Sequence, residues 1–255
     1  MKSKPLKISS IFLVILLLTA CTGDTHTISS TPKTASTLSP GHTTPTNSIS
    51  SIEIPESQGK KNTQSDINPL TGMGVSNPSL LNRRPVLVKI SNYPAVGRPH
   101  AGLAFADLVF DYYIGSGQNR FLALFYGQDA NSIGPVRSGR LVDIQLTNLY
   151  QGILGFGSAD GDTLNEIYKD LGRRAIANLE APCPAFCGND THSVIGVFAN
   201  SAEISRWYSQ QTGDAQRYDL SGMKFGDLDE TTAKSGEQVT IQFNYYNRTD
   251  WKYDP

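Results

Sequence analysis

Apolar side chains recur along residues 67–255 in two patterns, one typical of strands and the other typical of helices. Three short stretches are nearly continuous in apolar and β-branched residues, as expected of buried strands. They cover residues 84–90, 108–113 and 120–126. A loop at residues 114–119, which contains two glycines, separates the second stretch from the third. This spacing predicts an antiparallel hairpin.

Three longer stretches carry apolar residues three and four positions apart and therefore predict helices. They cover residues 142–150, 162–171 and 201–211. The second is expected to start at Asp162 and the third at Ser201, since both residue types are common at helix N-termini.

Near the end of the chain, residues 238–243 alternate between apolar and polar in the manner of a half-exposed strand. Residues 251–253 are predicted to be the partner of this strand, with residues 244–250 between them. Together these patterns predict an α/β fold, in which helices accompany a mixed sheet.

The first twenty residues have the composition of an export signal. Three lysines precede eight apolar residues at positions 11–18, and Thr19, Ala20 and Cys21 follow. Eight residues of helix span about 12 Å, whereas a bilayer core is ~30 Å thick. We therefore predict a signal peptide over residues 1–20 and a lipidated Cys21 at the mature N-terminus, which would place the protein outside a bacterial cytoplasmic membrane. An ordinary signal peptide with a chance cysteine is the alternative.

The segment after Cys21 is predicted to be a disordered linker. Of its residues 22–66, 19 are Ser or Thr, and apolar residues recur at no helical or strand period. Without residues 1–20 the chain has 19 Lys and Arg against 23 Asp and Glu, a net charge of about −4. Because it also lacks a basic block, no nucleic-acid partner is expected.

Several blocks of sequence, in matching order and spacing, resemble the YerB-like bacterial lipoproteins, a family catalogued as a domain of unknown function. The blocks are residues 68–72, 84–92, 98–103, 106–111, 120–125 and 134–140. The resemblance implies an N-terminal α/β domain over residues 67–226 and the start of a C-terminal β domain over residues 227–255. This second domain is expected to be truncated, because family members continue through further strands. The resemblance implies no reaction.

The strongest candidates for ligand binding are four arginines and one asparagine that follows the first predicted strand. They are Arg98, Arg120, Arg137, Arg140 and Asn92. Arg137 and Arg140 would share one face if the chain were helical from Val136 onward. Two converging guanidinium groups can bind a carboxylate or a phosphate in bidentate fashion. In the alternative, the arginines pair with acids and only stabilise the fold, the candidate acids being Asp107, Asp111, Asp129 and Asp143.

A catalytic interpretation rests on three other residues. Asp107 and Asp111 lie an even number of positions apart, so both would face the same side of a strand. Paired carboxylates can act as general acid and base in glycan cleavage, and His192 is a further candidate. The alternative places Asp107 at the start of the strand, where it caps the chain or pairs with an arginine.

Cys183 and Cys187 form an even pair once Cys21 is lipidated, and an oxidising compartment favours a disulfide between them. A metal site, a redox role and free thiols are the alternatives, although His192 alone would leave a zinc site short of one ligand. The glycine-rich residues 155–161 lack the lysine of a phosphate-binding loop. They are expected to join a strand to a helix, or alternatively to let the backbone approach a ligand.

These observations predict a membrane-anchored, non-catalytic module that binds an anionic cell-wall polymer or an envelope protein, with no cofactor and no metal. One alternative is a hydrolase of cell-wall glycan or peptide. The other is a structural subunit that a partner completes.

Overall fold

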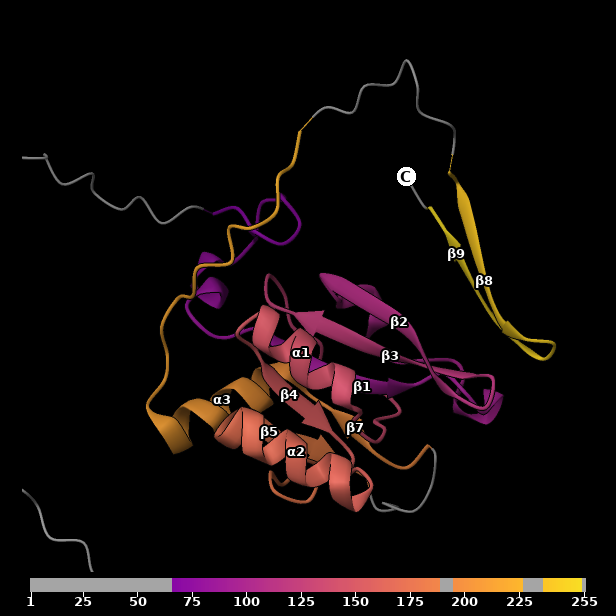
Figure 1. Cartoon of the computed structure of the whole chain (residues 1–255). Helices are drawn as coiled ribbons and strands as arrows, with labels where there is room; N and C mark the ends of the chain where they lie inside the picture. The colour runs from indigo at the N-terminus through magenta and orange to yellow at the C-terminus, as the bar shows by residue number, and fades with distance from the viewer. Residues whose placement is uncertain (1–65, 189–194, 227–235, 254–255) are drawn as a thin grey trace, which may run out of the picture. The chain divides into compact units, whose positions relative to one another are not determined.

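The computed structural model describes residues 66–188, 195–226 and 236–253, which all belong to one compact unit (Figure 1). The predicted signal peptide, Cys21 and the predicted linker lie outside the described residues, and so does His192. Among the residues that are described, no helix is long and apolar enough to cross a membrane.

The centre of the fold is a five-stranded mixed sheet with the strand order β2-β3-β1-β4-β5. β3 pairs in antiparallel fashion with β1 and β2, whereas β4 is parallel to β1 and β5. The strands are β1 (Val86–Ser91), β2 (Leu108–Gly115), β3 (Gln118–Phe125), β4 (Ile153–Phe156) and β5 (Ala175–Ala177). The predicted α/β class and the antiparallel hairpin of the second and third apolar stretches are confirmed.

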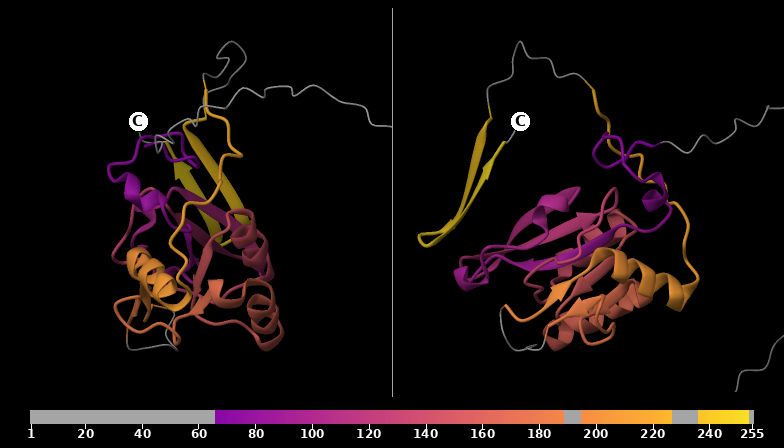
Figure 2. Two further views of the ribbon diagram at one scale, coloured as in Figure 1. Left: turned by 90° about the vertical axis from the view of Figure 1, so that its left-hand side faces the viewer. Right: turned by 180° about the vertical axis from the view of Figure 1, so that it is seen from behind.

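Helices cover both faces of this sheet (Figures 1 and 2). α1 (Leu141–Leu149) and α2 (Gly161–Leu171) pack on one face, and α3 (Ser201–Thr212) packs on the other, beside the short strands β6 (Phe186–Cys187) and β7 (Phe198–Ala199). Four 3₁₀ helices lie in the connections: Pro78–Leu81, Ala95–Gly97, Leu103–Phe105 and Gly172–Arg174.

The alternation of side chains along β1 explains the two cores. Val86, Val88 and Ile90 are buried in the core that includes α3, while Leu87 is buried in the core that includes α1 and α2. Lys89 shares the face of Leu87 and is fully buried. A fully buried lysine needs a polar or oppositely charged partner, so the neighbours of Lys89 are of particular interest.

The connection between β2 and β3 is tighter than the six-residue loop that the sequence suggested. Gly115 pairs with Gln118, so that only Ser116 and Gly117 form the turn, with φ angles of 51° and 70°. A two-residue turn with positive φ at both positions matches the twist of a hairpin.

The hairpin of β8 (Gln238–Asn244) and β9 (Asn247–Lys252) is likewise tighter than expected. Tyr245 and Tyr246 connect the strands, and β9 includes most of the residues that the sequence assigned to the loop. Five of the six residues of β9 are polar or charged, so the sequence shows no alternation of apolar and polar residues there.

α3 starts at Ser201 as expected, α2 starts at Gly161, one residue before the expected Asp162, and the glycine-rich residues do join a strand to a helix. The side chains of Asp160 and Asn200, just before the expected starts, cap α2 and α3 by accepting hydrogen bonds from backbone N–H groups. Gly155 and Phe156 belong to β4 and not to a glycine-rich loop. Four residues are too few for a strand to show a period in the sequence.

The predicted disulfide is confirmed. Cys183 and Cys187 are bonded, with their Cα atoms 4.7 Å apart. The ring that they close ends in β6, whose Phe186 is buried in the core on the α3 side.

Candidate functional site

An extended segment, residues 135–139, lies between the carboxyl ends of the parallel strands β1 and β4. The backbone N–H of Arg137 donates to Lys89 O at 2.9 Å, and Arg137 O accepts from the N–H of Gly157 at 2.9 Å. The chain is therefore extended here, so the condition under which Arg137 and Arg140 would share one face of a helix is not met. α1 starts only at Leu141. Ligands in α/β folds commonly bind outside the carboxyl ends of parallel strands.

This segment and its neighbours bring three of the four predicted arginines together. Burial, together with the positive charges of Arg140 and Arg137, lowers the pKa of Arg120 to about 10. Burial and Arg140 lower the pKa of Arg137 in the same direction. The geometry agrees, because Arg120 Nη1 donates to the carbonyl oxygen of Ser138, the residue that follows Arg137. We call Arg120, Arg137 and Arg140 the three-arginine site.

No carboxylate among the described residues pairs with the three-arginine site. None of the ion pairs in this part of the chain includes the side chain of Arg120, Arg137 or Arg140. Arg120 Nη1 donates to Ser138 O at 2.6 Å, and Arg140 Nη1 donates to Gly139 O at 3.0 Å. The Nε atoms of Arg120 and Arg137 are buried without a hydrogen-bond partner. Arg120 is only 7% exposed.

A buried ion pair lies beside this site. Lys89 Nζ is 3.2 Å from Asp143 Oδ1, and both side chains are fully buried. The hydroxyl of Tyr112 bonds to both groups. Asp143 Oδ2 also accepts the backbone N–H of Arg140 at 2.7 Å and so fixes the start of α1. With these contacts, the Asp143 carboxylate is already engaged.

The pKa values of Lys89 and Tyr112 are shifted by their burial and by the charges around them. Burial, with smaller contributions from the charges of Arg120 and Arg140, lowers the pKa of Lys89 to about 8, although Asp143 opposes the change. Burial and the Asp143 charge raise the pKa of Tyr112. The sequence did not predict that Lys89, Asp143 and Tyr112 form a group. The available signal was a single lysine inside a continuous apolar strand, which is buried only with a partner.

Arg98 and Asn92, the other two candidates, lie apart from the three-arginine site and bind the β8–β9 hairpin. Arg98 Nε donates to Asn92 O at 3.0 Å and its Nη2 contacts Asn247 Oδ1 at 3.5 Å. Asn92 Nδ2 donates to Asn119 Oδ1 at 3.1 Å and to Thr249 Oγ1 at 3.2 Å. These contacts give both residues a role in docking the hairpin.

Asp111 also belongs to this docking region. Its Oδ1 accepts a hydrogen bond from Asn119 Nδ2, and its Oδ2 is buried. Burial raises the pKa of Asp111. Nearby, the ring of Trp251 packs against Phe121 at 5.7 Å between centroids and attaches the hairpin to the α3 side of the sheet.

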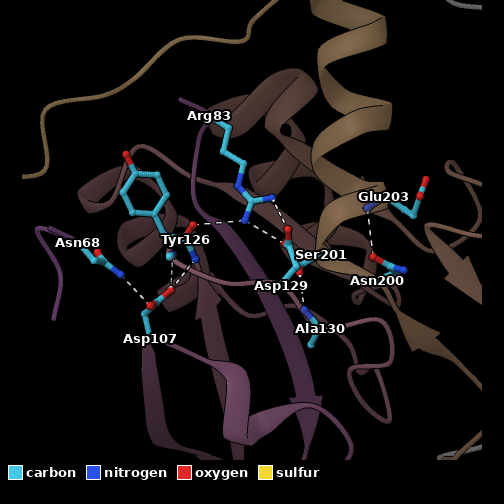
Figure 3. A network of polar contacts seen from close by, with 10 residues as sticks. Asn68, Arg83, Asp107, Tyr126, Asp129, Ala130, Asn200, Ser201 and Glu203 are labelled. Atoms are coloured by element: carbon cyan, nitrogen blue, oxygen red, sulfur yellow. Dashed lines mark hydrogen bonds and ion pairs between the residues drawn. The ribbon is translucent and has the colours of Figure 1, made fainter. Parts of the chain in front are cut away.

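Asp107, the other candidate carboxylate, has a different set of partners (Figure 3). Its Oδ1 accepts from Asn68 Nδ2 at 2.7 Å, and its Oδ2 accepts from the N–H groups of Tyr126 and Gly127 at 2.6 and 3.0 Å. Burial raises the pKa of Asp107, whereas these hydrogen bonds favour the charged form. Asp107 thus anchors the chain just before β2, and its contacts are separate from those of Asp111.

Asp129 also has partners of its own (Figure 3). Arg83 forms a bidentate pair with it, with N–O distances of 2.9 and 3.0 Å. Ser201 Oγ donates to Asp129 Oδ1 at 2.6 Å and accepts the N–H of Ala130 at 3.1 Å. All four acids that the sequence offered as partners of the candidate arginines therefore have other partners.

Comparison with known proteins places this arrangement in a family. A family model described as "Protein of unknown function (DUF3048) N-terminal domain" matches residues 70–211, more than half of the chain. The chain belongs to this family. The matched DUF3048 region contains the whole three-arginine site, and the YerB-like resemblance is confirmed.

One curated protein and one solved structure are similar to this DUF3048 chain. "Putative lipoprotein YerB" of Bacillus subtilis (strain 168) is 39% identical over 85 residues, which are 33% of this chain and 25% of that protein. A crystal structure of YerB from Bacillus subtilis superimposes with a TM-score of 0.59 at 24% identity and covers 74% of this chain and 63% of the other. The chain thus spans about a quarter of the curated relative, and the structural likeness establishes a shared fold.

Proposed function

We propose that this chain is a lipid-anchored envelope protein whose α/β domain binds an anionic group of the cell envelope at the three-arginine site. The observation that carries the proposal is the absence, among the described residues, of any carboxylate paired with Arg120, Arg137 or Arg140. An uncompensated buried charge destabilises a fold. A bound anion would compensate it.

Anchoring through Cys21 rests on two observations. Basic and apolar residues precede Cys21 in the order of a lipoprotein signal, and the relative YerB is described as a lipoprotein. Two acyl chains would hold the protein at the outer side of the cytoplasmic membrane. The ligand would then be a cell-wall polymer or an envelope protein with exposed anionic groups.

The contacts of the two candidate carboxylates favour binding over hydrolysis. Asp107 accepts three hydrogen bonds that anchor the chain, and Asp111 lies where the hairpin docks. Neither belongs to the three-arginine site. We therefore assign no reaction to this pair.

Co-sedimentation of the full chain with purified cell-wall sacculi tests the proposal. We expect the unmodified chain to pellet with the sacculi and the double variant Arg137→Ala/Arg140→Ala to stay in solution. The matched control is Lys169→Ala/Arg206→Ala, which removes the same charge from exposed ion pairs on α2 and α3. If both variants pellet equally well, the three-arginine site is not the binding site. Release of soluble wall fragments by the unmodified chain would contradict a non-catalytic role.

A further inference from the structure

The charges around the three-arginine site do not balance. Among the described residues, the site has four positive charges, from Lys89, Arg120, Arg137 and Arg140. Asp143 contributes one negative charge, so three positive charges remain. Asp160, before α2, feels the charge of Arg140, but it is solvent-exposed and caps Thr163 N. Even with Asp160 counted, the described residues leave two positive charges uncompensated.

Arg120 is held in place without its hydrogen-bonding capacity being filled. Its residue is 7% exposed, and the bond from Nη1 to Ser138 O fixes the plane of the guanidinium group. Its Nε has no partner. A guanidinium group has five N–H donors in a rigid fork, so such a fixed and unsatisfied group is suited to an acceptor with several oxygens.

The backbone around the site is also fixed. Hydrogen bonds to the ends of β1 and β4 hold residues 135–139 on both sides, and Arg140 is the N-cap of α1. The backbone that carries Arg137 and Arg140 therefore needs no reorganisation to bind a ligand, which strengthens binding because less entropy is lost. The N-terminus of α1 adds partial positive charge.

We infer that the anion bound at the three-arginine site is a phosphoryl group and not a carboxylate, an inference that rests on the proposed function. A phosphoryl group presents three terminal oxygens and about −1.5 to −2 charges at pH 7. A carboxylate presents two oxygens and one charge. The phosphoryl group thus matches both the number of guanidinium groups and the surplus charge.

Titration calorimetry of the full chain in detergent with phenyl phosphate and with benzoate tests the inference, because the two probes share a ring and differ in the anionic group. We expect phenyl phosphate to bind at least about tenfold more tightly, a difference of about 1.4 kcal/mol. Its affinity should also rise as the pH increases through about 6, where its second proton is lost. The groups that face the site are the three arginines, Lys89 of β1, Tyr112 of β2, Asp143 of α1 and Asp160.

Variants test whether Arg137 binds the phosphoryl group. Arg137→Gln should weaken phenyl phosphate binding by about tenfold or more, as expected for a lost hydrogen bond to a charged group. Arg137→Lys, which keeps the charge, should weaken it less, and Arg206→Gln on α3 should leave it unchanged. Near-ultraviolet circular dichroism verifies that each variant is folded.

Two results would overturn the inference in different ways. If benzoate binds as tightly as phenyl phosphate and Arg137→Gln weakens both, the site binds anions but does not select phosphoryl groups. If neither probe binds to the folded chain, the proposed function fails as well.

A phosphoryl group can belong to a lipid or to a soluble molecule, and a second arm distinguishes these sources. Vesicles of phosphatidylcholine with phosphatidic acid present a lipid phosphomonoester. If the folded chain binds these vesicles and phenyl phosphate displaces it, the inference extends to lipid headgroups. If it binds phenyl phosphate alone, the inference stands for soluble phosphoryl groups.

Discussion

Lys89 and Asp143 form a fully buried ion pair that joins the central strand β1 to the first turn of α1, with 3.2 Å between Nζ and Oδ1. Tyr112 of β2 bonds to both groups and completes the contact. Three elements that are distant in the sequence are therefore joined at one point, next to the three-arginine site.

Removing one partner of this pair should destabilise the protein strongly. We expect Asp143→Ala to lower the free energy of unfolding by about 3–5 kcal/mol, because Lys89 would remain as a buried charge without a counter-charge. Urea unfolding followed by circular dichroism measures the effect. The control Glu203→Ala breaks an exposed pair and should change stability by about 0.5 kcal/mol or less. Similar values for the two variants would contradict a structural role of the buried pair.

His100 should make stability depend on pH. Burial lowers its pKa below the ordinary 6.5, although a hydrogen bond between Nε2 and Ser91 O opposes the change. The unfolded chain therefore takes up a proton at this position at a higher pH than the folded chain does. Stability contributed by neutral His100 is complete above about pH 6.5 and is lost as the pH falls toward the folded pKa.

Thermal unfolding between pH 7.5 and 5 tests this expectation. The decrease in Tm on acidification should be smaller in His100→Gln than in the unmodified chain. A proton NMR titration of the His100 ring should place its pKa below 6.5. Equal slopes for both chains would mean that His100 does not contribute.

The β8–β9 hairpin should be released when its buried asparagine is removed. Asn247 is 1% exposed, and its Nδ2 donates to Gly117 O at 3.0 Å and to Asn119 Oδ1 at 2.9 Å. We expect Asn247→Ala to weaken docking by about 1–3 kcal/mol, because two hydrogen bonds between the hairpin and β3 with its preceding turn are lost. Hydrogen exchange of the amides in β8 and β9 should become faster. The control is Tyr246→Ala in the same hairpin, where the side chain is 84% exposed, and unchanged exchange in Asn247→Ala would contradict the docking contact.

The disulfide should stabilise the fold by a modest amount. Cys183 and Cys187 close a ring of five residues, for which the loop-entropy relation gives about 2 kcal/mol. The double variant Cys183→Ser/Cys187→Ser should lower the free energy of unfolding by about this amount in urea. Addition of a reductant should lower the stability of the unmodified chain but leave that of the variant unchanged. A variant as stable as the unmodified chain would contradict this role.

The sequence predicted the parts of the fold that follow from local patterns. The apolar stretch that became β1 and the periodic stretches that became α1, α2 and α3 show their character within a few residues. β4 and β5 were not delimited, because strands of four and three residues carry no period. Their place in the sheet depends on pairing with β1, which a local pattern does not contain.

The candidate site shows the same limit. Arg137 and Arg140 do lie near each other. The segment that carries Arg137 is extended, between β1 and β4, and is not helical. Arg120 joins them through the pairing of β3 with β1 and β2. Arg98 instead contacts Asn247, a residue 149 positions further along the chain. Such contacts are set by tertiary structure, so residue type alone could suggest the candidates but could not sort them.

Asn119 and Arg120 are neighbours on β3, and their side chains leave opposite faces of the sheet. Asn119 binds the β8–β9 hairpin on the α3 side, and Arg120 belongs to the three-arginine site on the α1 side. Two adjacent residues near the start of β3 therefore provide the hairpin contact and the most buried arginine of the site. A bound anion at Arg120 would therefore lie next to the contact that holds the β8–β9 hairpin on the sheet.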